Sequence, residues 1–99
     1  TGVEWPQPAT IPPTFRLEQN YPNPFNPSTT ISFELPVRTF VTVGVYDLLG
    51  REVEVLVSGE LSPGRHQRYW DASGLASGVY LCRMQVGAIV HSRKILVMR

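Results

Sequence analysis

The sequence contains a single cysteine, Cys82, and this scarcity excludes an internal disulfide. One thiol also leaves too few thiolates for a structural zinc site. No run of residues approaches the roughly 18 consecutive apolar positions that a membrane-spanning helix requires. The eight glycines stand singly at turn positions, so a glycine-rich loop for phosphate is absent from the sequence. Disulfide scaffolds, membrane helices and nucleotide-binding loops are therefore not expected.

The composition indicates one small globular domain. The chain has 99 residues, of which 42% are apolar and 17% charged, a balance typical of globular proteins. The net charge is only +1 but is unevenly spread: residues 1–60 hold three basic and seven acidic side chains, and residues 61–99 hold six basic side chains and one acid, Asp71. Such asymmetry can mark a docking surface for an anionic partner. Interleaving of strands from the two halves, which would pair the charges, is the simpler expectation.

Residues 1–14 have the composition of a semi-rigid, extended linker. They contain Pro6, Pro8, Pro12 and Pro13 and show no apolar periodicity. Neither an initiator methionine nor a signal peptide is present at Thr1, so we expect a piece of a longer chain in which something larger precedes the linker. The predicted organisation is a linker at 1–14 and a folded domain at 15–99.

From Thr30 onward the apolar residues recur with a period of two, which predicts half-buried strands. Ile31, Phe33 and Leu35, for example, alternate with polar residues. The expected strands lie near 15–18, 30–35, 41–46, 52–57, 66–71, 80–86 and 89–98, with turn residues at 58–60 and 62–64. No segment has a helical pattern. About seven strands separated by turns predict an all-β fold, an antiparallel β-sandwich without helices, in which Trp70 fills the core and strand 80–86 is central.

The most unusual segment is the run from Gln19 to Pro27, which has three prolines in six residues. Proline fixes its φ angle near −65° and has no N–H group, and the residue before a proline is pushed toward extended backbone. We therefore expect a loop that is stiff without hydrogen bonds. It lies directly before the first long strand.

Residues that could support catalysis or bind a metal are few. His66 and Asp71 with Ser73 or Ser77 could be combined into a triad, but no nucleophile-elbow pattern accompanies them. His66 and His91 with a nearby aspartate match no recurrent metal-ligand spacing. We expect no catalytic residue, no metal site and no cofactor.

Two further groups of residues are explained by the fold. Cys82 shares an alternation face with Tyr80, so it is expected to be a buried apolar residue and not a reactive thiol. Arg68, Tyr69 and Trp70 resemble a small basic and aromatic cluster, but alternation directs some of them inward. Nucleic-acid binding is therefore not expected.

Several ordered motifs together resemble one known family, the C-terminal sorting domain, type A, of the type IX (Por) secretion system. The resemblance covers about Phe15 to Arg99. The motifs that carry it are Leu17–Ile31, Leu35–Pro36, Val45–Gly50, Gly64–His66, Trp70–Asp71, Ser77–Tyr80 and Lys94–Arg99. The family has an immunoglobulin-like fold, related to the immunoglobulin-like domain of flagellar hook-capping proteins.

The resemblance implies a non-catalytic secretion signal. Such a domain follows a cargo in the same chain, passes through the periplasm and is recognised by the outer-membrane translocon. A sortase-like transpeptidase then removes it as the cargo reaches the cell surface or the exterior. The positions that match the family's motifs, and so become candidates for translocon recognition, are Pro22, Asn23, Pro24, Phe25, Gly50, Gly78, Tyr80, Lys94 and Arg99.

Two alternatives stay open at this point. A sandwich behind a proline-rich linker could be a carbohydrate-binding module, with Trp5, Tyr69 or Trp70 as a stacking platform. It could also be a structural spacer for a neighbouring domain. For the sorting signal, replacing residues 23–25 with Gly-Ser-Gly is expected to stop export with little change in thermal unfolding, and the last strand is expected to offer an exposed edge for strand addition.

Overall fold

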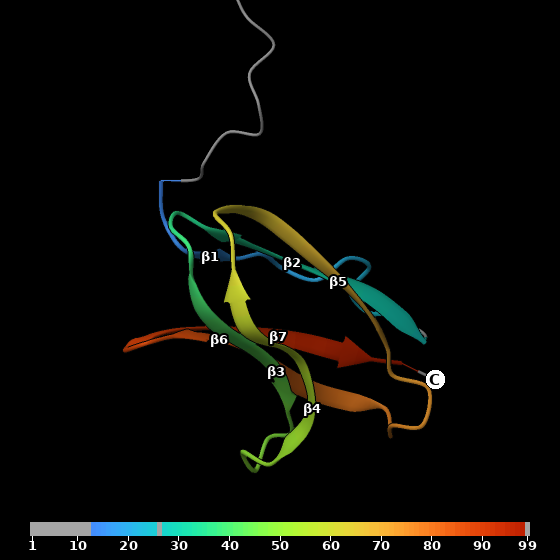
Figure 1. The fold of residues 1–99 in the computed structure, drawn as a ribbon. Helices are drawn as coiled ribbons and strands as arrows, with labels where there is room; N and C mark the ends of the chain where they lie inside the picture. Colours follow the sequence, from blue (N-terminus) through green and yellow to red (C-terminus); the bar gives the residue numbers. More distant parts are fainter. Residues whose placement is uncertain (1–12, 26, 99) are drawn as a thin grey trace, which may run out of the picture.

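A computed structural model of the chain describes residues 13–25 and 27–98, which form two facing antiparallel sheets (Figure 1). One sheet has the strand order β1-β2-β5 and the other β4-β3-β6-β7. The strands are β1 (Arg16–Leu17), β2 (Ser28–Leu35), β3 (Thr39–Tyr46), β4 (Glu52–Leu61), β5 (Gly64–Asp71), β6 (Gly78–Val86) and β7 (Ile89–Val97). The predicted all-β sandwich of seven strands is confirmed.

In the described part of the chain, the structure has no helix that is both long and apolar enough to cross a membrane.

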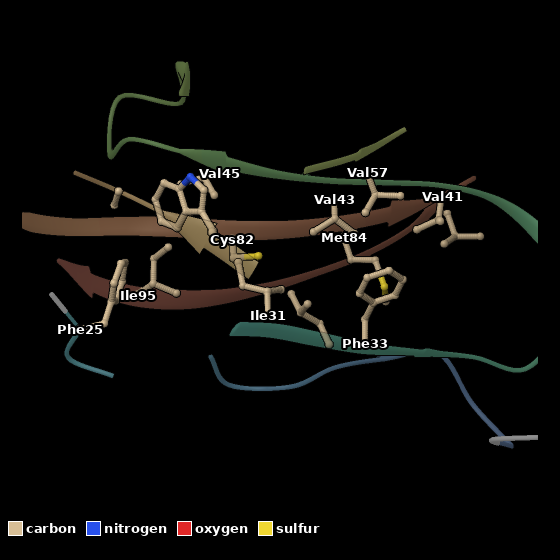
Figure 2. Close-up of a cluster of buried hydrophobic side chains, with 14 of the residues drawn as sticks. Phe25, Ile31, Phe33, Val41, Val43, Val45, Val57, Cys82, Met84 and Ile95 are labelled. Carbon is tan, nitrogen blue, oxygen red and sulfur yellow. The ribbon is translucent and has the colours of Figure 1, made fainter. Parts of the chain in front are cut away.

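The period-two pattern places the apolar side chains between the sheets, as predicted. Ile31 and Phe33 of β2 face Val43 of β3 and Met84 of β6 in the space between the two layers (Figure 2). Most apolar side chains on the two inner faces are almost completely removed from water. Because burial of apolar surface stabilises folding by roughly 25 cal/mol per Å², this layer is the main source of stability.

Trp70 closes one side of the sandwich, and its predicted place in the core is confirmed. The indole lies on β5, is buried, and donates from Nε1 to Oε1 of Glu54 on β4 at 3.0 Å. Since β5 and β4 belong to different sheets, this bond ties the two layers together. A buried indole N–H ordinarily finds a partner of this kind.

One turn was predicted wrongly. Residues 58–60 were expected to form a turn, but they continue β4 to Leu61, and Gly59 lies opposite Val41 of β3. The main chain of β3 offers a full ladder of hydrogen bonds there, and this tertiary pairing outweighs the local turn preference of Ser58 and Gly59. The chain instead turns at Ser62 and Pro63 and passes to the other sheet.

The turn between β3 and β4 is organised by Asp47. Its Oδ1 accepts hydrogen bonds from the N–H groups of Leu49 and Arg51, each at 2.9 Å, and its Oδ2 accepts one from Nε of Arg51 at 2.8 Å. The pKa of Asp47 is lowered, first by the hydrogen bond from the Arg51 main chain and then by that residue's side chain. Gly50 has φ = 84°, a conformation that glycine adopts without the steric cost of a Cβ atom.

Cys82 lies in the centre of β6, which is flanked by β3 and β7 as predicted. The thiol is buried, and this burial raises its pKa from 9.0 to about 12. The folded state thus holds the thiol proton more tightly than the unfolded chain, so the stability due to this group is complete below pH 9 and is lost as the pH rises toward 12. The buried-residue interpretation of Cys82 is confirmed.

We expect this ionisation to be measurable. Relative to Cys82→Ala, the free energy of unfolding of the native sequence should fall by an amount on the order of 2 kcal/mol between pH 8 and pH 11. Urea denaturation of both proteins at each pH measures the difference, and the comparison cancels the titration of all other groups. A constant difference between the two proteins would show that the thiol is not shielded in the way the fold indicates.

Candidate functional site

Residues 19–25, which we call the bridging loop, connect the two sheets at one end of the sandwich. On one side Tyr21 exchanges main-chain hydrogen bonds with Thr30 of β2, at 3.1 and 3.0 Å. On the other side Phe25 donates to the carbonyl of Leu96 at 3.1 Å and accepts from the N–H of Met98 at 2.9 Å. The loop therefore leaves the three-stranded sheet and joins the edge of the four-stranded sheet.

Two buried polar side chains fix the first half of the loop. Asn20 is 3% exposed, and its Nδ2 donates to the carbonyl of Pro22 and to Oγ1 of Thr29, both at 3.0 Å. Thr29, also buried, donates from Oγ1 to the same carbonyl at 2.8 Å. The expectation of a loop without hydrogen bonds is therefore wrong: proline removes donors from the main chain, but its carbonyls remain acceptors.

The bridging loop also covers part of the edge of β7. Oδ1 of Asn23 accepts from the N–H of Leu96 at 2.9 Å, and Nε2 of Gln19 donates to the carbonyl of Lys94 at 2.7 Å. With the two bonds from Phe25, the outward main-chain groups from the carbonyl of Lys94 to the N–H of Met98 are occupied. The last strand is thus not an open edge along its whole length, and only its first half, near Val90, remains for strand addition.

Phe25 anchors the loop in the core. Its ring is 2% exposed and lies against Trp70, with the ring centroids 5.7 Å apart and the planes at 56°. Figure 2 shows Phe25 beside Ile95 at one end of the buried layer. The Gly-Ser-Gly replacement of residues 23–25 would therefore remove a core side chain, so we expect it to lower thermal stability, in contrast to the small change predicted from the sequence.

The exposed part of the bridging loop is a short proline ridge. Pro22, Asn23 and Pro24 are all exposed, and Tyr21 beside them is 81% exposed. The peptide bonds before Pro22 and Pro24 are both cis. The ridge is thus held from beneath by Asn20, Thr29 and Phe25 while its own surface faces solvent.

Strand register brings most of the other candidate residues to the same end of the four-stranded sheet. Gly78, at the start of β6, lies opposite Val97, which in turn bridges to Phe25. Tyr80 is partly buried against the core, and its hydroxyl donates to the carbonyl of Ala76 at 2.8 Å.

The remaining candidates differ in how closely they approach the loop. Lys94 is exposed, and its carbonyl contacts the loop through Gln19. Gly50 lies in the β3–β4 turn, at this end of the sheet. Among the hydrogen bonds of the described residues, none joins Gly50 to the bridging loop. Arg99 lies outside the described residues.

The chain approaches β1 at the opposite end of the sandwich. Arg16 pairs with Glu34 near the end of β2, whereas the bridging loop precedes the start of β2 at Ser28. Figure 1 accordingly shows the beginning of β1 far from the C-terminal end of β7. Residues upstream of β1 therefore join the domain away from the proline ridge.

The imagined triad is not assembled. The ring of His66 stacks on Phe33 with the centroids 5.4 Å apart, and its Nε2 lies 2.8 Å from the carbonyl of Ser62. Oδ1 of Asp71 instead accepts from the main-chain N–H of Ser73 at 2.8 Å, and this bond is the first cause of the lowered pKa of Asp71. Within residues 13–25 and 27–98 no three His, Cys, Asp or Glu side chains are grouped as metal ligands.

The roles of Asn20 and Thr29 were not predicted from the sequence. Both lie inside the motif that carried the family resemblance, but neither was singled out. Their roles could have been inferred from the composition of the loop. Prolines have carbonyl groups that accept hydrogen bonds but no N–H groups that donate them, so a nearby amide or hydroxyl side chain is the expected donor.

A search of curated proteins finds no significant match to the chain. The model of the family described as the secretion system C-terminal sorting domain matches residues 19–98, from the start of the bridging loop to the residue after β7. The chain therefore belongs to this family, whose members are C-terminal sorting signals for type IX secretion.

Proposed function

We propose that the proline ridge, formed by Pro22, Asn23 and Pro24, is the surface by which the outer-membrane translocon of the type IX system recognises this sorting signal. The observation that carries the proposal is the combination of an exposed ridge with a buried support. The ridge faces solvent, while Asn20, Thr29 and Phe25 hold its main chain from inside.

A rigid surface favours recognition because little conformational entropy is lost when it binds. The fixed φ angles of the prolines restrict the ridge, and the bonds from Asn23 and Phe25 to β7 restrict it further. A receptor therefore meets a preformed shape whose geometry depends on both sheets. An unfolded or misfolded domain would not present it.

The position of the upstream chain is compatible with this role. Because β1 begins at the opposite end of the sandwich, a cargo joined through residues 1–14 would leave the ridge accessible. In our proposal the domain follows its cargo into the periplasm and engages the translocon by the ridge. A sortase-like transpeptidase then separates it from the cargo, which ends at the cell surface or outside the cell.

The test is an export assay with the whole chain fused behind a periplasmic reporter, in hosts with and without the type IX apparatus. We expect the double variant Pro22→Ala/Pro24→Ala to reduce apparatus-dependent export by at least about tenfold, equivalent to a loss of ~1.4 kcal/mol in recognition. Asn23 is kept in this variant, because its side chain caps the N–H of Leu96.

The matched control is Pro63→Ala, an exposed proline in the β4–β5 connection. It should leave export unchanged, and circular dichroism should show that both variants are folded at the temperature of the assay. Export of the double variant at the native level would refute recognition by the ridge. Export that is equal in both hosts would refute the sorting function itself.

The carbohydrate-binding alternative loses most of its predicted platform. Trp70 is buried, and Trp5 lies outside the described residues. Tyr69 remains exposed, and it shares the outer face of the three-stranded sheet with Tyr21 because both lie in register with Thr30 of β2. Isothermal titration with soluble β-linked polysaccharides separates the two functions, since a sorting signal should give no binding heat.

A further inference from the structure

The acidic side chains of residues 1–60 and the basic side chains of residues 61–99 were expected to pair in the folded domain. Most of them do not pair in the described residues. The ion pairs of the described residues are Arg38–Glu60, Arg51–Asp47 and Arg65–Glu18. Of these only Arg65–Glu18 joins the acidic first part of the sequence to the basic second part. From residue 72 to residue 98 the sequence contains three basic residues and no acid, so the β6–β7 hairpin is uniformly cationic.

Two of these cations lie on one open face. Arg83 lies opposite Ser92, and Lys94 lies opposite Leu81, so these four residues of β6 and β7 share a face. It is the outer face, because their neighbours Cys82 and Met84 are buried. Arg83 and Lys94 are diagonal neighbours, a position that separates residues by roughly 7–8 Å.

The third cation of the hairpin, Arg93, is hydrogen-bonded within the domain. Arg93 points between the sheets and donates from Nε to the carbonyl of Leu17 at 2.9 Å. By contrast, neither Arg83 nor Lys94 forms an ion pair with any acidic side chain in residues 13–25 and 27–98. Their charges are therefore available to a partner.

Arg83 is held in place before any partner arrives. Its guanidinium carbon lies 4.8 Å from the centre of the Tyr46 ring, within cation–π range. The ring itself lies close to Gly44, where an added Cβ would come within 3.3 Å of the Tyr46 Cε1 atom. Glycine at this position thus leaves the space that the ring uses, and the ring in turn orients Arg83 on the surface.

We propose that the outer face of β6 and β7, centred on Arg83 and Lys94, binds an acidic, extended segment of a protein of the secretion machinery. The inference rests on the proposed sorting function and adds a second contact to it. Charge complementarity selects the occupant, since two cations on one face, neither with an acidic partner among the described residues, attract carboxylates. Glu52 of β4 lies in register with Tyr46, so a negative charge borders Tyr46 on the side away from β6 and disfavours an acidic segment there. The segment is therefore confined to the β6–β7 side.

The test measures binding of a fluorescent glutamate-rich peptide to the whole chain by anisotropy. We expect binding at low ionic strength that weakens steeply with added salt, because exposed charges are screened over about 10 Å at 0.1 M. The double charge reversal Arg83→Glu/Lys94→Glu should weaken binding by at least about tenfold. The charge-preserving pair Arg83→Lys/Lys94→Arg should retain most of it.

The matched control is Arg38→Glu, which reverses an exposed cation outside the β6–β7 hairpin. The inference is overturned if this control weakens peptide binding as much as the double reversal, or if the double reversal has no effect. It is also overturned if the chain binds vesicles of anionic lipid through Arg83 and Lys94 but not the peptide. The export assay with the proline variants decides the proposed function separately, so either can fail alone.

Discussion

Replacing Phe25 with alanine is expected to lower the free energy of unfolding by about 3–5 kcal/mol, the cost of removing a buried aromatic side chain. The ring is enclosed in the core against Trp70, and it is the anchor by which the bridging loop reaches the four-stranded sheet. Urea denaturation measures the loss. Hydrogen exchange should also quicken at the amides of Leu96 and Met98, since these groups are hydrogen-bonded to the loop.

Tyr21→Ala is the control for this experiment, because it removes an aromatic ring of the same loop that is 81% exposed. It should cost less than about 1 kcal/mol, in keeping with surface substitutions. If Phe25→Ala were as mild as Tyr21→Ala, the loop would not depend on the core, and the buried support proposed for the proline ridge would be wrong.

Asn20→Asp is expected to destabilise the domain by about 3–5 kcal/mol at neutral pH although it hardly changes the shape of the side chain. The amide of Asn20 donates two hydrogen bonds, to the carbonyl of Pro22 and to Thr29. A carboxylate has no proton to donate, faces the Pro22 carbonyl and must be buried with its charge.

The pH dependence distinguishes this explanation from a simple loss of contacts. Burial would raise the pKa of the new carboxyl group in the folded state, so the stability of Asn20→Asp should recover as the pH falls and the group takes up a proton. Asn20→Ala should cost about 1–3 kcal/mol without such recovery. Equal stability of Asn20→Asp at acidic and neutral pH, relative to Asn20→Ala, would show that the amide is not buried as described.

The strands could be predicted from the sequence because their signal is local. Alternation at Ile31, Phe33 and Leu35, for example, reports only on which face of one strand is buried, and the structure has the same face inward. The central place of β6 and the burial of Trp70 followed from the same pattern. The function was predicted from the family resemblance, because the alternation of apolar residues carries no information about function.

The construction of the site could not be predicted in this way. Gln19 and Asn23 bind main-chain groups of Lys94 and Leu96, which are 75 and 73 positions away in the sequence. Such long-range contacts produce no repeating pattern in the sequence around either residue, so they cannot be predicted from it. For the same reason Phe25 was assigned to the surface with its proline neighbours, since nothing within the loop indicates that one of its residues turns inward to Trp70.

The pairing of Phe25 with Val97 has a consequence for biosynthesis. A ribosome makes the bridging loop early and its partner strand last, so the loop cannot settle until nearly the whole domain has emerged. A polypeptide released before Lys94 would lack both the acceptor for Gln19 and the amide for Asn23. Truncated products would consequently carry an incomplete signal, and only finished cargo would be competent for export.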